Sequence, residues 1–144
     1  MSEESTTPDL VELFLRSVEA FNRRDFDAVM SIYSPDVAWD ASIRDADRYE
    51  GAAALRGFLE EWQALYEEYT LEVEEIADLG NGVTFAVFLQ KARPLGIQGY
   101  VEMRDAWAHL WEKGLIVHAT GYFDIDEARA AAQRLAESRA QADA

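Results

Sequence analysis

A carboxylate and a guanidinium group stand two residues apart, at Glu102 and Arg104, within a stretch of alternating polar and apolar residues. Alternation in a strand would point both side chains to one face. Buried beside this cation, Glu102 could act as a general base. Arg104 could instead hold a ligand carboxylate through two parallel hydrogen bonds. A purely structural ion pair is the alternative interpretation of the same spacing.

Three further side chains could transfer protons, but alternation turns them away from a cavity. Trp39 and Ala41 are apolar, so a strand that buries them points Asp40 to the opposite face, and Asp40 is a candidate base only if it turns inward. Counting back from the end of the chain's last strand places His118 on the outer face and the set Val117, Ala119, Gly121 and Phe123 on the cavity face. His109, opposite on the neighbouring strand, is expected to face outward as well.

Gln90 is expected to lie across a hairpin from Arg104 and to share its face. Aromatic side chains would supply the rest of a hydrophobic wall. The candidate ligand-binding residues are Arg104, Gln90, Tyr33, Trp39, Phe58, Trp62, Phe88 and Phe123. A wall of this kind suits a flat or aliphatic hydrophobic molecule.

Composition restricts the classes of function. The chain has 144 residues, 49% of them hydrophobic, no cysteine and two histidines. This length is enough for one domain with its own core, and the residue types exclude a cysteine-rich or three-histidine zinc site. The formal net charge of −15 disfavours nucleic acids and anionic membranes. We expect a cytoplasmic protein without metal or cofactor.

The elements that would position these residues follow from hydrophobic periodicity. Helices are expected from Thr7 to Asn22, from Asp25 to Tyr33, from Gly51 to Tyr66 and after Asp124. Strands are expected over residues 36–41, 69–79 and 83–93, followed by two strands between Gly99 and Asp124. We expect residues 1–6 to be disordered, residues 7–135 to form a single domain, and residues 136–144 to be a fraying helix end. Helices and antiparallel strands segregated in this way indicate an α+β domain.

Three segments carry a family resemblance: FNRRDFDAVMSIYSPDVAWDAS, YEGAAALRGFLEEW and AHLWEKGLIVHATGYFDIDEA. Their order and spacing resemble the nuclear transport factor 2-like superfamily, and within it the SnoaL-like, polyketide-cyclase type. The resemblance implies a cone in which a strongly curved, mainly antiparallel sheet wraps around helices and encloses a pocket. It also implies a partner subunit on the outer sheet face. We therefore expect a homodimer through a face that carries Trp107, His109, Trp111 and His118.

The family's known chemistries do not transfer completely to these residues. A ketosteroid-isomerase-like set would place its base at Asp40 or Ala41, its tyrosine at Ser17 and its acid at Ala106. An epoxide-hydrolase-like set would fall on Gln90, Phe88 and Gly121. A dehydratase-like set needs an inward histidine paired with an aspartate. Two functions stay open: an enzyme of proton transfer, dehydration or hydrolysis with Glu102 or Asp40 as base, and a non-catalytic module that binds a hydrophobic ligand or dimerises.

Overall fold

The structure is a computed structural model that describes residues 9–41 and 47–143. The tail expected to be disordered, residues 1–6, lies outside this described part. In chain order the elements are α1 (Leu10–Asn22), α2 (Phe26–Met30), β1 (Tyr33–Asp40), β2 (Arg48–Glu50), α3 (Ala52–Ala64), β3 (Tyr66–Gly80), β4 (Val83–Pro94), β5 (Val101–Glu112), β6 (Leu115–Tyr122) and α4 (Ile125–Asp143).

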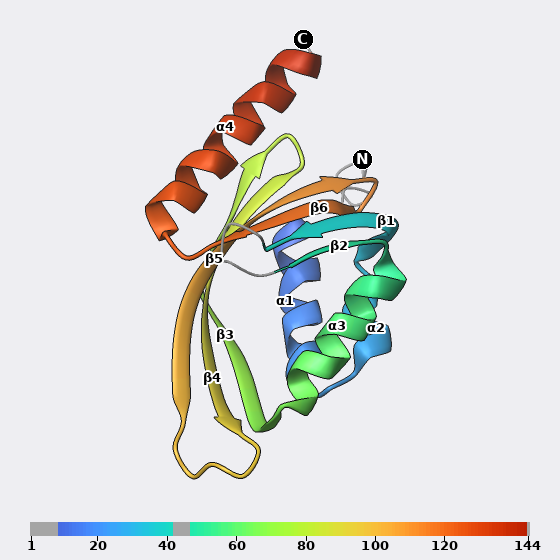
Figure 1. Ribbon diagram of the computed structural model, residues 1–144. Helices are drawn as coiled ribbons and strands as arrows, with labels where there is room; N and C mark the ends of the chain where they lie inside the picture. Colours follow the sequence, from blue (N-terminus) through green and yellow to red (C-terminus); the bar gives the residue numbers. More distant parts are fainter. Residues whose placement is uncertain (1–8, 42–46, 144) are drawn as a thin grey trace.

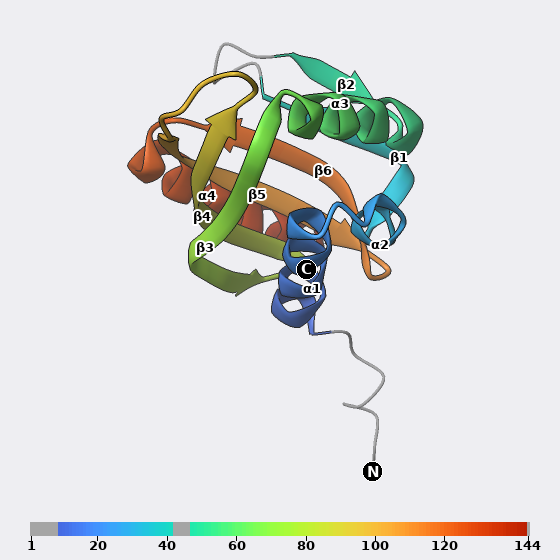
Figure 2. The ribbon, with the colours of Figure 1, turned by 90° about the horizontal axis from the view of Figure 1, so that it is seen from below.

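All six strands belong to one curved, open sheet in the order β2-β1-β6-β5-β4-β3. Neighbouring strands run antiparallel, except that β1 and β6 are parallel. Helices α1, α2 and α3 lie on the concave side of the sheet, and α4 packs on the opposite side (Figure 1). Seen from below, the sheet bends around α1 and α3 (Figure 2). The expected α+β cone is confirmed.

Helix starts and turns have local causes. The side chains of Asp9, Asp25 and Asp124 each accept a hydrogen bond from a backbone N–H three residues later and cap α1, α2 and α4. Asp9 therefore occupies the N-cap position of α1 that was expected at Thr7, a residue outside the described part. Asn81 stands between two glycines in the turn that joins β3 to β4, where its φ is +59°.

Two local assignments from sequence are wrong. Tyr33 was expected in the second helix, but α2 ends at Met30 and Tyr33 begins β1. Strand β2 was not expected at all. It exists through its pairing with β1, in which Trp39 lies opposite Tyr49. A strand of three residues is too short to show an alternating pattern in the sequence, so β2 could not be predicted from local periodicity.

The two faces of the sheet bury different kinds of side chain. On the concave face, large aromatic residues pack against the helices, among them Trp39, Phe88, Trp107 and Trp111, and Phe14 of α1 belongs to the same cluster. On the convex face, Val83, Phe85, Val87, Ala106 and Ala108 pack against Ala128, Ala132 and Ala136 of α4. Alanines on both partners let the helix approach the sheet closely.

The expected facing of β5 is inverted. Gln90 was expected opposite Arg104, but Gln90 pairs with Met103 and Leu89 pairs with Arg104. The observed register of β4 and β5 is therefore shifted by one residue from the predicted register. A one-residue shift moves every side chain of a strand to the other face. Trp107 and its neighbours at i±2 therefore point into the concave side, where they are buried.

This inversion removes the expected dimer surface. Trp107, His109 and Trp111 are 5%, 3% and 3% exposed and are internal, while His118 is exposed on the outer face as expected. The convex face that remains outside α4 is charged: Arg104 donates two hydrogen bonds to Glu74, one of 2.8 Å. Among the described residues, no helix is long and apolar enough to cross a membrane.

Candidate functional site

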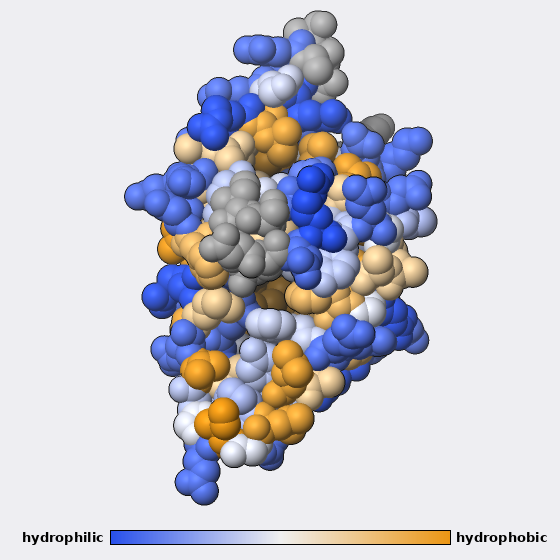
Figure 3. Space-filling model, in the orientation of Figure 1, coloured by the Kyte–Doolittle hydropathy of each residue, from blue (hydrophilic) through white to orange (hydrophobic). Residues whose placement is uncertain are grey.

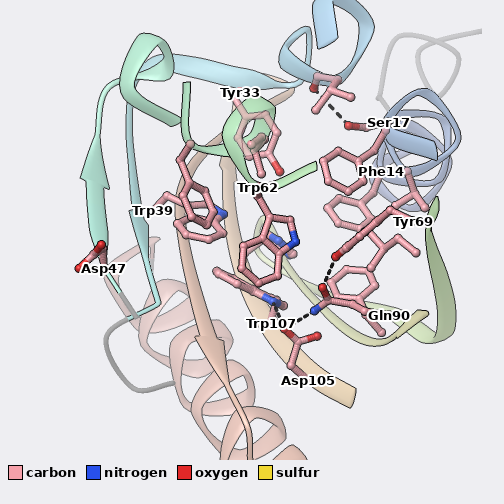
Figure 4. Close-up of a pocket in the computed structure, with 18 residues that line it drawn as sticks. Phe14, Ser17, Tyr33, Trp39, Asp47, Trp62, Tyr69, Gln90, Asp105 and Trp107 are labelled. Carbon is pink, nitrogen blue, oxygen red and sulfur yellow. Dashed lines mark hydrogen bonds between the residues drawn. The ribbon is translucent and has the colours of Figure 1, made fainter. Parts of the chain in front are cut away.

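A cavity of about 290 Å³ lies between the concave face of the sheet and helices α1 and α3 (Figure 4). Its wall is mainly aromatic; the rings come from Phe14, Phe21, Tyr33, Trp39, Phe58, Trp62, Tyr69, Phe88, Trp107 and His109. Trp39 and Trp107 stack with ring centroids 4.6 Å apart. This volume and lining suit a small, flat, mostly apolar molecule.

Strand β5 contributes three consecutive inward side chains to this cavity: Asp105, Trp107 and His109. They follow the two-residue period of a strand. Asp105 is fully buried, at 0% exposure. The described lining residues include two acids, Asp47 and Asp105. Asp47 is exposed and lies to the side of the cavity in Figure 4, so of these two only Asp105 places a buried carboxyl group in the cavity wall.

A chain of hydrogen bonds runs across the cavity wall to Asp105. The Tyr69 hydroxyl donates to Oε1 of Gln90, and Nε2 of Gln90 donates to Oδ2 of Asp105 at 3.1 Å. The indole N–H of Trp107 donates to the same oxygen at 3.2 Å. Donors from two strands thus fix the orientation of the Asp105 carboxyl group. A carboxyl group held in this way can accept or deliver a proton at a defined position.

His109 is packed between rings. Its centroid is 4.8 Å from that of Phe14 and 6.3 Å from that of Trp107. Burial lowers the pKa of His109 to about 3, so the imidazole is neutral at neutral pH. Its Nδ1 is buried and has no hydrogen-bond partner among the described residues.

Two hydroxyl groups also line the cavity. Ser17 donates to the backbone carbonyl of Val29 at 3.1 Å, which ties α1 to α2. The Tyr33 hydroxyl forms no hydrogen bond within the described part of the chain, and burial raises the pKa of Tyr33 above the ordinary range of tyrosine. Tyr33 and Asp105 lie at opposite ends of the cavity in Figure 4.

The structure brings together most of the predicted ligand-binding residues. Those that line the cavity are Gln90, Tyr33, Trp39, Phe58, Trp62 and Phe88. Phe123 does not line it: this residue follows the end of β6 and is 51% exposed.

The predicted charged residues lie elsewhere. Arg104 is exposed and paired with Glu74 on the convex side, and Glu102, two residues before it, is exposed as well. Asp40 is half-buried, does not line the cavity, and lies 3.6 Å from Arg48. The expectation that Glu102 and Arg104 face the cavity is wrong, and the register shift described above is the reason.

Sequence reasoning missed Asp105 and His109 as cavity residues. A signal for them was present, because Ala106 and Ala108 alternate with Trp107 in β5. An alanine face on a strand matches the alanine-rich C-terminal helix, whereas a tryptophan face needs the larger space of the concave side. Among the described residues, no group of three or more His, Asp or Glu could hold a metal ion.

Comparisons with known proteins agree with this architecture. A family model described as the SnoaL-like domain matches residues 14–94. A nuclear transport factor 2-like protein of unknown function from Burkholderia pseudomallei is 19% identical, with a TM-score of 0.70 over 84% of this chain and 95% of that chain. TerC, crystallised with polyporic acid, is 17% identical, with a TM-score of 0.68 over 87% and 98%.

A candidate polyketide cyclase from Xanthomonas campestris pv. campestris is 23% identical, with a TM-score of 0.64 over 82% of this chain and 92% of that chain. At these identities the structural likeness shows a shared fold. No curated protein sequence matches this chain.

Proposed function

On the premise that this chain belongs to the SnoaL-like domain family, we propose that it binds a small, mostly apolar molecule in its aromatic cavity and moves a proton on it with Asp105. The buried, oriented carboxyl group of Asp105 is the observation that carries this proposal. Relatives of the same fold support the binding of small molecules, since TerC was crystallised with polyporic acid.

The geometry favours proton transfer over reactions that need more groups. Asp105 lies in a wall of rings, where water is scarce and a positioned base is effective. Its carboxylate would take a proton from a carbon beside a carbonyl group, and the resulting carboxylic acid would return a proton to the enolate. The same group can in this way serve as base and acid in turn.

A second function is favoured by one observation. Oδ2 of Asp105 already accepts hydrogen bonds from Gln90 and Trp107, as expected of a carboxylate whose task is to hold a wall together. In that case the protein would bind its ligand without changing it.

Deuterium exchange separates these two functions. 2-Tetralone, a flat bicyclic ketone with acidic α-hydrogens, is incubated with the protein in D₂O, and loss of its α-proton signal is followed by NMR. We expect exchange above the buffer rate and a loss of roughly 100-fold or more in Asp105→Asn, the range typical of a removed general base. Binding of 2-tetralone, measured by titration calorimetry, should persist in that variant.

Glu102→Gln is the matched control, because it removes an exposed carboxylate from the same strand. Its exchange rate should equal that of the wild type. If the wild type binds 2-tetralone without accelerating exchange, the non-catalytic function stands and proton transfer is overturned.

The proposal keeps the expected cytoplasmic location and a homodimer, now through a new surface. Apolar side chains gather at the tip of the β4–β5 hairpin in Figure 3, where Leu95, Ile97, Tyr100 and Val101 are more than half exposed. Exposed apolar patches often mark contact surfaces. Light scattering tests this surface: Ile97→Asp should give a monomer, and Gln98→Asp should not.

A further inference from the structure

We propose that His109 and Tyr33 form a subsite of the cavity that binds an uncharged oxygen of the ligand, such as a carbonyl or hydroxyl oxygen. This inference rests on the proposed function, since it names the chemistry of the molecule that the cavity receives. It concerns residues other than the Asp105 network.

The position of His109 carries the inference. The ring lines the cavity, is only 3% exposed, and lies against the rings of Phe14 and Trp107. No described residue forms a hydrogen bond with its Nδ1. Buried polar groups in native proteins nearly always have a partner, and an imidazole without one is costly. Nδ1 is itself enclosed by protein, so the nitrogen that a ligand in the cavity would meet is Nε2, which in the neutral ring can carry the proton and donate it to a ligand oxygen.

Tyr33 adds a second polar group to the lining of the same cavity. Its side chain enters from the start of β1, and its hydroxyl points into the cavity in Figure 4. Within the described part of the chain, the hydroxyl has no hydrogen bond, so it can donate to a ligand oxygen. Strands β1 and β5 thus each bring one polar side chain of the subsite to the cavity.

The charge of both groups selects the ligand. Burial keeps His109 uncharged, with a pKa lowered to about 3, and keeps the Tyr33 hydroxyl protonated. Two neutral groups cannot offset the loss of hydration of a carboxylate or an ammonium group. They can satisfy a neutral oxygen, which needs one or two hydrogen bonds.

The two polar regions also set the length of the ligand. His109 follows Asp105 by four residues in β5, a separation of roughly 13 Å between Cα atoms at about 3.3 Å per residue. Trp107, between them, offers a flat apolar surface. The ligand is therefore expected to be flat and to carry its neutral oxygen away from the carbon that Asp105 deprotonates.

Three probes of one skeleton test the subsite: naphthalene, 2-naphthol and 2-naphthoate, with dissociation constants from titration calorimetry at pH 7. We expect 2-naphthol to bind roughly 3- to 10-fold more tightly than naphthalene, the ratio of one neutral hydrogen bond. Naphthoate should bind more weakly than naphthalene. Equal binding of naphthol and naphthalene, or tightest binding of naphthoate, would overturn the subsite.

Variants assign the preference to its residues. His109→Phe keeps an aromatic ring and should bind naphthalene while losing the preference for naphthol; Tyr33→Phe should lose part of it. His118→Gln, which changes the exposed histidine, should keep the full preference. A preference that survives His109→Phe unchanged would contradict the assignment.

A measurement on the unaltered protein guards against variants that fail to fold. The chain has two histidines, so a spectrum of protein labelled with ¹⁵N-histidine contains two imidazoles, and His118→Gln identifies them. Naphthol should shift the His109 nitrogen signals and naphthalene should shift them less; equal shifts would overturn the subsite. If Asp105→Asn leaves tetralone exchange unchanged while the naphthol preference persists, proton transfer fails and the subsite stands.

Discussion

Gly121 on β6 lies directly against the indole of Trp107 on β5. The two residues are cross-strand partners, and a Cβ atom at position 121 would stand 2.5 Å from Cζ2 of that ring. The missing side chain leaves room for the indole, which stacks on Trp39. Trp107 therefore forms a wall of the cavity instead of filling it.

Replacement of Gly121 by alanine should push the Trp107 ring away from β6. The methyl group overlaps the indole ring, so the ring must shift into the cavity and give up part of its stacking on Trp39, and overpacking of this kind costs about 1–3 kcal/mol. We expect this loss in the free energy of unfolding, measured with urea, together with weaker binding of naphthalene in the narrowed cavity.

Gly57→Ala in α3 is the matched control. A Cβ atom at Gly57 would meet no atom within 4 Å, and alanine favours the interior of a helix over glycine by roughly 0.5–1 kcal/mol. This variant should be as stable as the wild type or more so. If both substitutions changed stability equally, close contact with Trp107 would not be the cause at Gly121.

Gln90→Leu should be far more harmful than Arg104→Ala, although the sequence suggested that the two residues share one face. Removal of the Gln90 amide takes a donor from buried Asp105 and an acceptor from Tyr69, at a cost of about 1–3 kcal/mol. Arg104 is exposed, and surface ion pairs contribute about 1 kcal/mol or less. Thermal or urea unfolding of both variants checks this order, and a larger loss in Arg104→Ala would contradict it.

The sequence was sufficient for the fold because each long element carries its own period. The helix around Leu55 and Phe58, the turn at Asn81 and the cap at Asp124 are local patterns that the structure reproduces. The resemblance to SnoaL-like proteins then supplied the arrangement of these elements, which no local pattern determines.

The site was only partly predictable because it depends on the register between two strands. Trp39 and Phe88, which were expected in the wall as aromatic residues, do line the cavity. Asp105 was missed because the six-residue loop between β4 and β5 does not reveal that Gln90 pairs with Met103. A register error of one residue leaves the fold prediction intact and exchanges the inside and outside of a strand.

Ala132→Glu should destabilise the protein strongly, because Ala132 is fully buried where α4 meets the convex face. An unpaired carboxylate cannot be accommodated among Ala106, Ala108 and Phe85, and a buried charge or polar group without partners gives some of the largest losses seen for single substitutions, about 4 kcal/mol or more. Gln133→Glu, one residue further on the exposed side of the helix, should change little. Urea unfolding of both variants checks the prediction, and equal stability would mean that α4 does not pack on the sheet in solution.

Stability should fall with decreasing pH because of His109. The unfolded chain binds a proton at this ring below about pH 6.5, whereas the folded protein does so only near a pKa of about 3, owing to burial. Between these two pH values the unfolded state holds more protons than the folded state. The free energy of unfolding therefore falls by about 1.4 kcal/mol for each pH unit below pH 6.5.

His109→Phe removes this proton and keeps the aromatic packing against Phe14, so its free energy of unfolding should depend less on pH from 6.5 down to 5. Hydrogen bonds from Arg104 and Arg129 lower the pKa of Glu74 and Glu75. The protein therefore also loses the stabilisation from these two carboxylates when they are protonated in acid. Their contribution is common to both proteins and falls mainly below pH 5. Urea unfolding at pH 7.5, 6.5, 5.5 and 5.0 measures the difference between wild type and variant. Parallel curves would show that the ring of His109 is not buried in solution.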